Sequence, residues 1–460
     1  MAREANVAKM SPSGRVRRRV VVIGGGFAGI NAAQELANLP VDVTLVDRKN
    51  YHTFQPLLYQ VALAVLSPAD IAQPIRSILR DHPNVEVLMD EAIGLDLDQR
   101  QVHLKTGAML VYDFLIVASG STHSYFGHED WAKLAPGLKT VEDATEIRRR
   151  VLLAFELAER QMLEHGTHPP LNFVIIGGGP TGVELAGAIS DIARLYMRNN
   201  FRHIDTKQAK VMILEGSPKI LGMYPEDLQQ KARKQLEDLG VQLRTNAQVS
   251  EVQPGYVMVG DERIEAAVTL WAAGVKASPL GKLLGVETDR KGCVMVDEHL
   301  NPKGHPEIFV CGDLAHVEQD GRQVPGVAQP AMQMGVYAAR RIGVLVGREA
   351  GSEGAGTKGF HYFDKGDMAT IGRKAAVANI QWPFKAHWSG FMAWMAWLTV
   401  HIYFLIGFRN RLGVFRQWAW TYLTLQDGAR LITGSQDLPG WKNAPSPEPV
   451  SPPEVVGSRH

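Results

Sequence analysis

The chain has 460 residues, 45% of them hydrophobic and 21% charged, so it is long enough for roughly two to four globular domains. Its 49 basic and 48 acidic residues nearly balance, which gives no electrostatic reason to expect a nucleic-acid partner. Two cysteines, Cys293 and Cys311, are too few for the disulfide framework of a secreted protein, and they fit a reducing compartment.

A basic run at 15–19 is followed by a short apolar run, 20–23, and then by a group of glycines. A signal peptide needs an apolar core of about 7 to 15 residues, so we do not expect secretion. The apolar residues are all β-branched, and they predict a short strand instead.

The predicted strand runs into a turn with the spacing Gly-x-Gly-x-x-Gly, formed by Gly24, Gly26 and Gly29, and then into a helix-forming segment. The first glycine allows a tight turn, the second lets backbone approach a pyrophosphate, and the third lets helix pack on strand. Unpaired N–H groups at the start of such a helix favour phosphates. The next strand, 41–47, ends at Asp47, whose carboxylate is suited to accept hydrogen bonds from a ribose. These features predict a dinucleotide site.

A near copy of this pattern occurs later in the chain. A second apolar strand meets Gly177, Gly179 and Gly182, and the strand that follows ends at Glu215. Either acid would repel a 2′-phosphate, so we expect both sites to prefer dinucleotides without that group. Glu215 lies further from its glycines than the usual spacing of about 20 residues, which predicts a longer helix or an insertion at 196–208.

Three further apolar runs, at 114–120, 269–274 and 307–313, end in small residues and fit additional strands of a doubly wound fold. Small residues let a nucleotide lie close to the backbone, and Asp313 is suited to hydrogen-bond a chain of hydroxyl groups. With the two glycine turns, these runs predict an α/β protein with two Rossmann-like dinucleotide-binding domains.

In this order the motifs resemble those of the two-dinucleotide-binding flavoprotein oxidoreductases, and the resemblance extends over residues 17–345. It implies a discontinuous FAD-binding domain, at 17–125 and 288–345, with an NADH-binding domain inserted at 126–287. It assigns to FAD the residues Gly24, Gly26, Phe27, Ala28, Gly29, Asp47, Arg48, Ala118, Gly120, Gly312, Asp313, Ala328 and Gln329. It assigns to NADH the residues Gly177, Gly179, Pro180, Thr181, Gly182, Glu184, Glu215, Ala273 and Gly274.

Flavin and nicotinamide supply hydride transfer, so the final electron acceptor defines the enzyme. Disulfide reductases of this family use a pair of closely spaced cysteines near the flavin, and sulfide:quinone oxidoreductases also use cysteines. Here Cys293 and Cys311 lie on separate predicted strands. A sulfide:quinone or disulfide oxidoreductase is therefore an alternative, and a flavin- and NADH-binding redox sensor is another.

The segments between the core strands are similar to those of type II NADH dehydrogenase, the single-subunit NADH:quinone oxidoreductase of respiratory membranes. The similar segments are NYHTFQPLLYQVA (50–62), LSPADIAQPIR (66–76), AQPAMQ (328–333), DKGDMATIG (364–372) and FLIGFRNRLGVFRQWAWTYLT (404–424). The resemblance implies hydride transfer from NADH to FAD, and then electron transfer to a membrane quinone, menaquinone or ubiquinone, without proton pumping. It also implies a position on the cytoplasmic face of the inner membrane and is compatible with a homodimer. We expect no nucleic-acid partner and no metal site.

The same resemblance places Gln329 and Gln333 by the flavin and the quinone. Amide N–H groups can donate to quinone carbonyls without placing a charge in an apolar tunnel, whereas capping of nearby backbone is the alternative. Tyr51 and His52 are expected to shape the flavin pocket, with a packing role as the alternative.

Glu184 matches a family glutamate placed near the nicotinamide and flavin, with a role in quinone protonation or nicotinamide orientation. Asn31 stands at the matching position of the first copy, so the turn itself does not demand a carboxylate. The alternative is a capping box with Thr181. Lys365 resembles a family lysine near the flavin, and a solvated surface lysine is the alternative.

The composition changes near the C-terminus, where seven of the nine tryptophans fall within 382–441. Residues 388–408 carry no formal charge and are long enough for a membrane-spanning helix. Arg409, Arg411 and Arg416 follow, however, so a single span would place most of the positive charge outside. We therefore predict a helix lying in the membrane interface rather than a span, with lipid contacts that include Phe391, Met395 and Leu405 and with Ala393 against protein.

These patterns divide the last part of the chain into three regions. Residues 346–383 form a linker and a segment near the flavin and quinone site, and residues 384–430 form membrane-anchoring amphipathic helices. Residues 431–460 form a tail whose Pro-rich end is predicted to be disordered.

Overall fold

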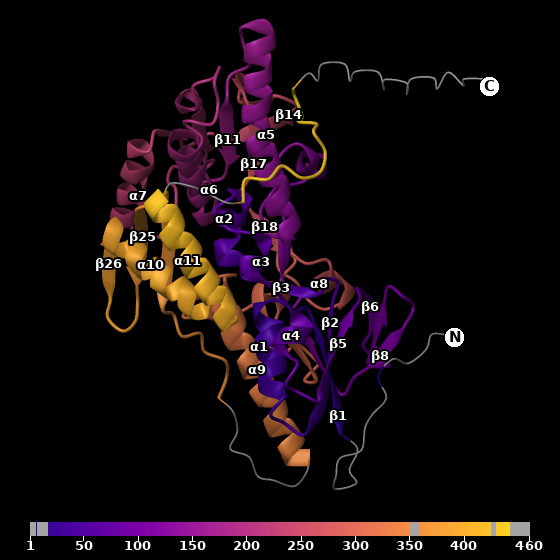
Figure 1. Cartoon of the computed structure of the whole chain (residues 1–460). Helices are drawn as coiled ribbons and strands as arrows, with labels where there is room; N and C mark the ends of the chain where they lie inside the picture. Colours follow the sequence, from indigo (N-terminus) through magenta and orange to yellow (C-terminus); the bar gives the residue numbers. More distant parts are fainter. Residues whose placement is uncertain (1–5, 7–16, 350–357, 425–428, 442–460) are drawn as a thin grey trace, which may run out of the picture.

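The structure, a computed structural model, describes residue 6 and residues 17–349, 358–424 and 429–441. The Pro-rich end of the predicted tail and most of the Gly/Ser-rich linker lie outside these residues. Figure 1 shows two groups of elements: β1, β2 and β5 lie near α1 and α9 at the bottom, whereas β11 lies near α5 and α6 at the top. The last helices, α10 and α11, run along one side between the two groups.

The first sheet is parallel and has the strand order β20-β9-β1-β2-β5. Its strands are β1 (Arg18–Ile23), β2 (Val41–Asp47), β5 (Val85–Met89), β9 (Phe114–Val117) and β20 (Ile308–Val310). The central strands are apolar because both faces of a parallel sheet are covered. This sheet joins strands from the two chain segments that we predict to form one discontinuous domain, although the exact domain boundaries stay predictions.

The second sheet is also parallel and has the order β13-β12-β11-β17. Its strands are β11 (Asn172–Ile176), β12 (Lys210–Leu214), β13 (Val241–Arg244) and β17 (Val268–Trp271). The apolar runs predicted at 114–120, 269–274 and 307–313 each overlap a strand of one of the two sheets.

Helices connect and cover the sheets. Beside the first sheet, α1 (Phe27–Leu36) packs against α9 (Ala328–Glu349). The chain segment that forms the second sheet also contains the helices α6 (Pro180–Asp191) and α7 (Glu226–Asp238), and α5 (Val141–His165) precedes its first strand. A π-helical turn (Ile192–Tyr196) and a short 3-10 helix (Thr206–Gln208) lie between α6 and β12, so the predicted lengthening around 196–208 is confirmed.

Smaller elements complete these parts. The short helices are η1 (Gln55–Leu57), α2 (Leu58–Ala62), α3 (Pro68–Ile71), α4 (Ile75–Ile78), η2 (Glu129–Lys133), α8 (Leu280–Leu283) and η5 (Gly312–Leu314). The antiparallel sheets contain β3 (Tyr51–Thr53) with β4 (Ala72–Pro74), β6 (Ala92–Asp96) with β7 (Gln101–Leu104) and β8 (Met109–Val111), β10 (Ser121–His123) with β18 (Val275–Ala277), β14 (Val249–Gln253) with β15 (Tyr256–Val259) and β16 (Glu262–Glu265), and β22 (Glu318–Gln319) with β23 (Arg322–Gln323). The short strands β19 (Val294–Met295) and β21 (Ala315–His316) pair in parallel.

The C-terminal part begins with an antiparallel sheet of β24 (Gly366–Ile371), β25 (Ala375–Ile380) and β26 (Ala386–Ser389). Two helices follow, α10 (Phe391–Phe404) and α11 (Phe408–Thr424). The helix predicted over the uncharged stretch 388–408 is therefore shorter than expected, since only α10 lies wholly within it. Gly390 and Gly407, with positive φ angles of 71° and 86°, lie on either side of α10 where regular structure is interrupted. Among the described helices, none is both long and apolar enough to cross a membrane.

The C-terminal helices share a hydrophobic core with the second sheet. Trp397, Leu405 and Val414 are almost completely buried in the cluster that also contains Phe173 and Ile175 of β11 and apolar residues of α6. The expected lipid contact of Leu405 is therefore wrong, since its side chain is 1% exposed. Phe391 and Met395 are exposed and Ala393 is buried, as expected for those three residues.

Candidate functional site

The first glycine turn leaves no room for side chains at two of its glycines. A Cβ atom on Gly24 would lie 2.3 Å from the Ala118 carbonyl oxygen, and one on Gly29 would lie 1.8 Å from the Gly24 carbonyl oxygen. A Cβ atom on Gly26 would meet no described atom within 4 Å. Gly26 is also the residue before the first turn of α1, so open space lies at the N-terminus of this helix, where an anion is favoured.

The second glycine turn repeats this geometry. A Cβ atom on Gly177 would lie 2.5 Å from the Ala272 carbonyl oxygen, and one on Gly182 would lie 2.0 Å from the Gly177 carbonyl oxygen. Gly179, like Gly26, faces open space. It precedes α6, whose first residues are Pro180 and Thr181.

The acids at the ends of β2 and β12 bind their glycine turns in the same way. Asp47 accepts hydrogen bonds from the backbone N–H groups of Gly25 (2.6 Å) and Lys49 (2.7 Å). Glu215 accepts corresponding bonds from Gly178 (2.6 Å) and Ser217 (2.7 Å), and a further one from the Ser217 hydroxyl. Because a carboxylate has about four acceptor positions, each acid can still accept from a ribose hydroxyl.

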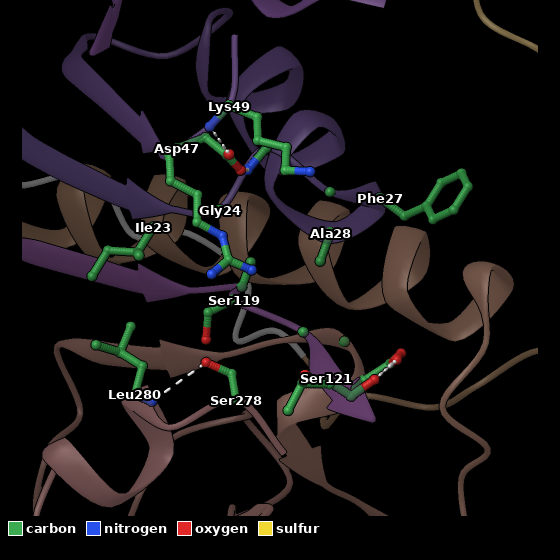
Figure 2. A pocket seen from close by; sticks show the side chains of 18 of the residues that line it. Ile23, Gly24, Phe27, Ala28, Asp47, Lys49, Ser119, Ser121, Ser278 and Leu280 are labelled. Carbon is green, nitrogen blue, oxygen red and sulfur yellow. Dashed lines mark hydrogen bonds between the residues drawn. The ribbon is translucent and has the colours of Figure 1, made fainter. Parts of the chain in front are cut away.

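A cavity of about 600 Å³ lies at the first turn. Figure 2 shows Asp47 at this cavity with its carboxylate bonded to the backbone of Lys49, and with Ser119 and Ser121 also on the wall. Of the residues predicted to bind FAD, those on the wall are Gly24, Gly26, Phe27, Ala28, Asp47, Arg48, Ala118, Gly120, Gly312, Asp313 and Ala328. Gly29 packs closely against Gly24 within the turn and is not on the wall, and Gln329 also lies outside the lining.

Sequence reasoning missed a polar group on this wall. The Asp313 carboxylate accepts hydrogen bonds from the Ser121 hydroxyl (2.6 Å) and the Lys139 ammonium (3.2 Å), and Lys139 also donates to Ser121 (2.7 Å). Thr140, which also lines the cavity, is the N-cap of α5 and forms a capping box with Asp143. For Thr140, the Thr-x-x-Asp pattern before a long amphipathic helix was the available sequence signal.

Glu184 lies on the second turn of α6 and is not a capping residue. The N-cap is Gly179 and no side chain caps the helix, so the capping-box alternative with Thr181 is wrong. Instead, a Glu184 carboxylate oxygen accepts a hydrogen bond of 3.5 Å from the backbone N–H of Thr370 on β24. The fold thus brings the C-terminal segment 364–372 to the predicted nicotinamide side.

Burial raises the pKa of Glu184 to about 8, and the Thr370 N–H opposes this shift only partly. The side chain lies deep in the protein although part of its surface remains accessible. Desolvation disfavours the charged carboxylate, so Glu184 holds a proton at neutral pH. A carboxylic acid with a pKa near the working pH is suited to donate that proton during a reaction.

The two glutamines of the Ala-Gln-x-x-x-Gln segment differ in their contacts. Gln333 donates to the Phe363 carbonyl (3.1 Å) and accepts from the Phe363 N–H (2.9 Å), so its amide holds nearby backbone. Gln329 lies in the first turn of α9 and is partly exposed, and its side chain has no hydrogen-bond partner among the described residues. The geometry therefore favours Gln329 as the glutamine available to a ligand.

Lys365, Tyr51 and His52, which were also predicted to lie near the flavin, have different surroundings. The Lys365 ammonium lies 5.3 Å from the ring centre of Phe404 on α10, and it is not on the cavity wall. Tyr51 lines the cavity and donates to Glu142 (2.8 Å), which also pairs with a neighbouring lysine. His52 is buried, its Nδ1 lies 2.9 Å from the Gly25 carbonyl, and burial lowers its pKa.

The cysteines do not form a reactive pair. Cys293 and Cys311 are both free and buried. Burial raises the pKa of Cys293 to about 11 and also raises that of Cys311, so both stay protonated near neutral pH. The described residues contain no cluster of side chains that could hold a metal ion.

Comparisons with known proteins agree with this architecture. Residues 18–335 match the family described as pyridine nucleotide-disulphide oxidoreductase, and residues 365–427 match the NDH2 C-terminal domain. The chain is 43% identical over 430 residues to type II NADH:quinone oxidoreductase NdhA of Mycobacterium tuberculosis, covering 91% of this chain and 90% of that protein.

Two solved structures show the same fold. NDH2 from Plasmodium falciparum, solved in complex with NADH, has a TM-score of 0.78 at 19% identity and covers 91% of this chain and 100% of its own. The sulfide:quinone oxidoreductase from Aquifex aeolicus has a TM-score of 0.66 at 19% identity, with 88% and 95% covered.

Two parallel sheets, each with a glycine turn and a terminal acid, place this chain among the pyridine nucleotide-disulphide oxidoreductases. The high identity over nearly the whole chain and the matching C-terminal domain narrow the class further. The chain belongs to the type II NADH:quinone oxidoreductases.

Proposed function

We propose that the chain binds FAD in the cavity at the first glycine turn and oxidises NADH with a membrane quinone while attached to a lipid surface. The repeated arrangement of turn and acid carries this proposal, because one copy opens into a cavity of about 600 Å³. When bound, FAD accepts a hydride from NADH and passes two electrons to the quinone.

The cavity residues suit FAD. Gly26 leaves space for a pyrophosphate at the N-terminus of α1, and Asp47 retains acceptor positions for a ribose. Asp313, Ser121 and Lys139 form a polar group that can hydrogen-bond a hydroxyl chain.

Two residues of the chain are proposed to act on the substrates. Glu184, which holds a proton at neutral pH, is suited to donate it during quinone reduction or to orient the nicotinamide. Gln329 is suited to donate an amide N–H to a quinone carbonyl oxygen. Lys365, held over Phe404, remains a third candidate near the site.

The proposed lipid contact is an apolar surface on the C-terminal part. Its exposed residues on α10 are Phe391, Met392, Met395, Val400 and Tyr403, those on α11 are Leu412, Phe415 and Trp420, and those in the turn before β26 are Trp382 and Phe384. Large apolar side chains gathered in this way are typical of interaction surfaces, and tryptophan favours the membrane interface. We propose attachment in the plane of the cytoplasmic face of the inner membrane, with a homodimer as a compatible assembly.

Anaerobic titration tests the central proposal. The purified protein should carry one noncovalently bound FAD per chain, and NADH should bleach its absorbance, which a membrane quinone analogue should restore. A folded protein without bound flavin would contradict the proposal, whereas bleaching without reoxidation by any quinone would favour the redox-sensor alternative.

Glu215 is expected to select NADH over NADPH, since its carboxylate would face a 2′-phosphate of the same charge. Glu215→Gln keeps the size of the side chain and removes its charge. The ratio of kcat/KM for NADH to that for NADPH should fall by about tenfold or more, which corresponds to about 1.4 kcal/mol. Glu237→Gln, which removes an exposed acid from α7, is the control and should leave the ratio unchanged. An unchanged ratio in Glu215→Gln would show that another residue discriminates.

Gln329→Leu should slow flavin reoxidation by quinone by up to about tenfold, the cost of one lost hydrogen bond to substrate, while flavin reduction by NADH stays unchanged. Stopped-flow absorbance measures the two half-reactions separately. Gln333→Leu is the matched variant, and it should lower the melting temperature because it frees the Phe363 backbone. Equal slowing of both half-reactions by Gln329→Leu would contradict its place at the quinone.

A further inference from the structure

A chain of hydrogen bonds, buried at its centre and partly buried at its two ends, connects α11 with Glu184. The Trp418 indole N–H donates to the Gln60 amide oxygen (2.7 Å), and the Gln60 amide nitrogen donates to the Tyr59 hydroxyl (3.0 Å). The Thr370 hydroxyl also donates to the Tyr59 hydroxyl (2.9 Å). The backbone N–H of Thr370 in turn donates to the Glu184 carboxyl (3.5 Å).

These contacts join four elements that are far apart in sequence: α2 with Tyr59 and Gln60, α6 with Glu184, the edge strand β24 with Thr370, and α11 with Trp418. Tyr59, Gln60 and Thr370 are at most 7% exposed. Burying polar groups is costly unless they are paired, so the hydrogen bonds that Tyr59 accepts at the buried centre of this chain restrain the geometry of its members.

Aromatic contacts support the same arrangement. The Tyr59 ring meets the Trp397 ring edge to face at 6.3 Å, and Trp397 lies 5.8 Å from Trp418. Trp397 is 2% exposed and belongs to α10. Both C-terminal helices therefore hold Tyr59 in place.

We propose that Tyr59 is a positioning residue that links the seating of α11 to the proton affinity of Glu184. Tyr59 accepts the Thr370 hydroxyl hydrogen bond and so fixes the edge of β24 that carries the Thr370 N–H. This N–H is the donor that favours the ionised form of Glu184. A displacement of α11 that breaks the Trp418 bond loosens Gln60 and Tyr59 and weakens that donor.

Other titratable groups face this region. Tyr224 lies near both Glu184 and Asp367, and Asp191 lies near Tyr59. Burial raises the pKa of both tyrosines and of Asp367, so the phenols stay neutral near neutral pH. Loss of the Thr370 donor therefore moves the Glu184 pKa upward.

The role of Glu184 in turnover belongs to the proposed function, so the test needs a readout that does not depend on it. Infrared spectroscopy of the holoenzyme can follow the carbonyl stretch of the protonated carboxyl, which is assigned by its loss in Glu184→Gln. Its titration midpoint reports the proton affinity of Glu184 with or without substrate.

Tyr59→Phe keeps the ring against Trp397 and removes the hydroxyl. Trp418→Phe removes the indole donor and keeps a smaller aromatic ring beside Trp397. We expect the midpoint of Glu184 to rise by up to about one pH unit in Tyr59→Phe, equivalent to one ordinary hydrogen bond. Trp418→Phe should shift it in the same direction by less. Trp420→Phe, a conservative change at an exposed indole of the same helix, should leave the midpoint at the wild-type value.

The proposed link between α11 and Glu184 and the proposed role of Glu184 in quinone reduction are contradicted by different results. Midpoints equal to that of the wild type in both Tyr59→Phe and Trp418→Phe, in folded flavin-loaded protein, would overturn the link. A shifted midpoint with a pH-independent reoxidation rate would leave the link intact and remove Glu184 from the quinone step instead. If Tyr59→Phe does not fold, Trp418→Phe and Thr370→Val provide the same comparison.

Discussion

Glu184→Gln should slow flavin reoxidation by quinone by about 100-fold, while flavin reduction by NADH stays close to the wild-type rate. The amide keeps the size of the side chain but cannot supply a carboxylic proton, and proton transfer by a positioned acid contributes about 10² to 10⁴ in rate. Stopped-flow measurement of each half-reaction separates the two roles proposed for Glu184. Slower reduction with normal reoxidation would assign the residue to nicotinamide orientation instead.

The pH dependence of reoxidation provides a second measure. Because the pKa of Glu184 is raised to about 8, its proton is present at pH 7 and is lost as the pH rises through that value. The wild-type reoxidation rate should therefore fall above about pH 8, whereas the rate of Glu184→Gln should stay flat. A wild-type rate that rises over this range would contradict a role as proton donor.

The same pKa shift has a consequence for stability. The folded protein binds a proton at Glu184 that the unfolded chain, with an ordinary glutamate pKa, has already lost. The contribution of this proton to the free energy of unfolding is thus fully present below the unfolded pKa of about 4.5, and it is lost as the pH rises through the folded pKa of about 8. Between these two pH values, the free energy of unfolding of the wild type should fall by at most about 5 kcal/mol relative to that of Glu184→Gln.

The two glycine turns and their acids were predictable because their parts are close in sequence. A strand, a turn, a helix and a terminal acid form one unit, and the spacing of Gly24, Gly26 and Gly29 fixes the turn. Asp47 and Glu215 hydrogen-bond their turns as the pattern implies. Such local geometry follows from backbone sterics and needs no knowledge of distant contacts.

The contacts around Glu184 were not predictable, since they join segments that are distant in sequence. Its partner Thr370 lies 186 positions later. The docking of β24 on α6 also depends on Gly187 and Gly372, because a Cβ atom on Gly187 would lie 2.4 Å from the Gly372 nitrogen. A glycine inside a predicted helix suggests close packing, but it does not identify the partner.

In the C-terminal helices, the positions of glycines indicate helix boundaries that the absence of charged residues does not indicate. The uncharged stretch 388–408 predicts one helix, yet Gly390 and Gly407 mark where regular structure is interrupted. The bulky residues also divide between two environments, since Trp397 and Leu405 enter the core whereas Phe391 stays exposed. Size and hydrophobicity do not distinguish a side chain that meets lipid from one that meets protein.

Replacing four exposed residues of α10, Phe391, Met392, Met395 and Tyr403, by Gln should release the protein from membranes. Fully burying one large apolar side chain stabilises by about 1.5 to 3 kcal/mol. If each of these residues is half inserted, the four contribute about 4 kcal/mol, or about three orders of magnitude in partitioning. Sedimentation with vesicles measures the bound fraction, and long-tailed quinones should lose activity more than a soluble electron acceptor.

The four-residue variant is a sharper test than deleting the chain from Phe384 onward. Such a deletion removes Trp397, Leu405 and Val414, which are buried in the core of the second sheet, so a loss of folding would resemble a loss of anchoring. Gln substitutions at exposed helix positions preserve that core and the helix itself. A control variant that replaces the exposed residues Met89, Leu163 and Met223 by Gln should stay on the vesicles.

High salt should fail to extract the wild type, because apolar contact is not screened by ions. Extraction by salt alone, or full binding of the four-residue variant, would show that charge or another surface holds the protein to the membrane.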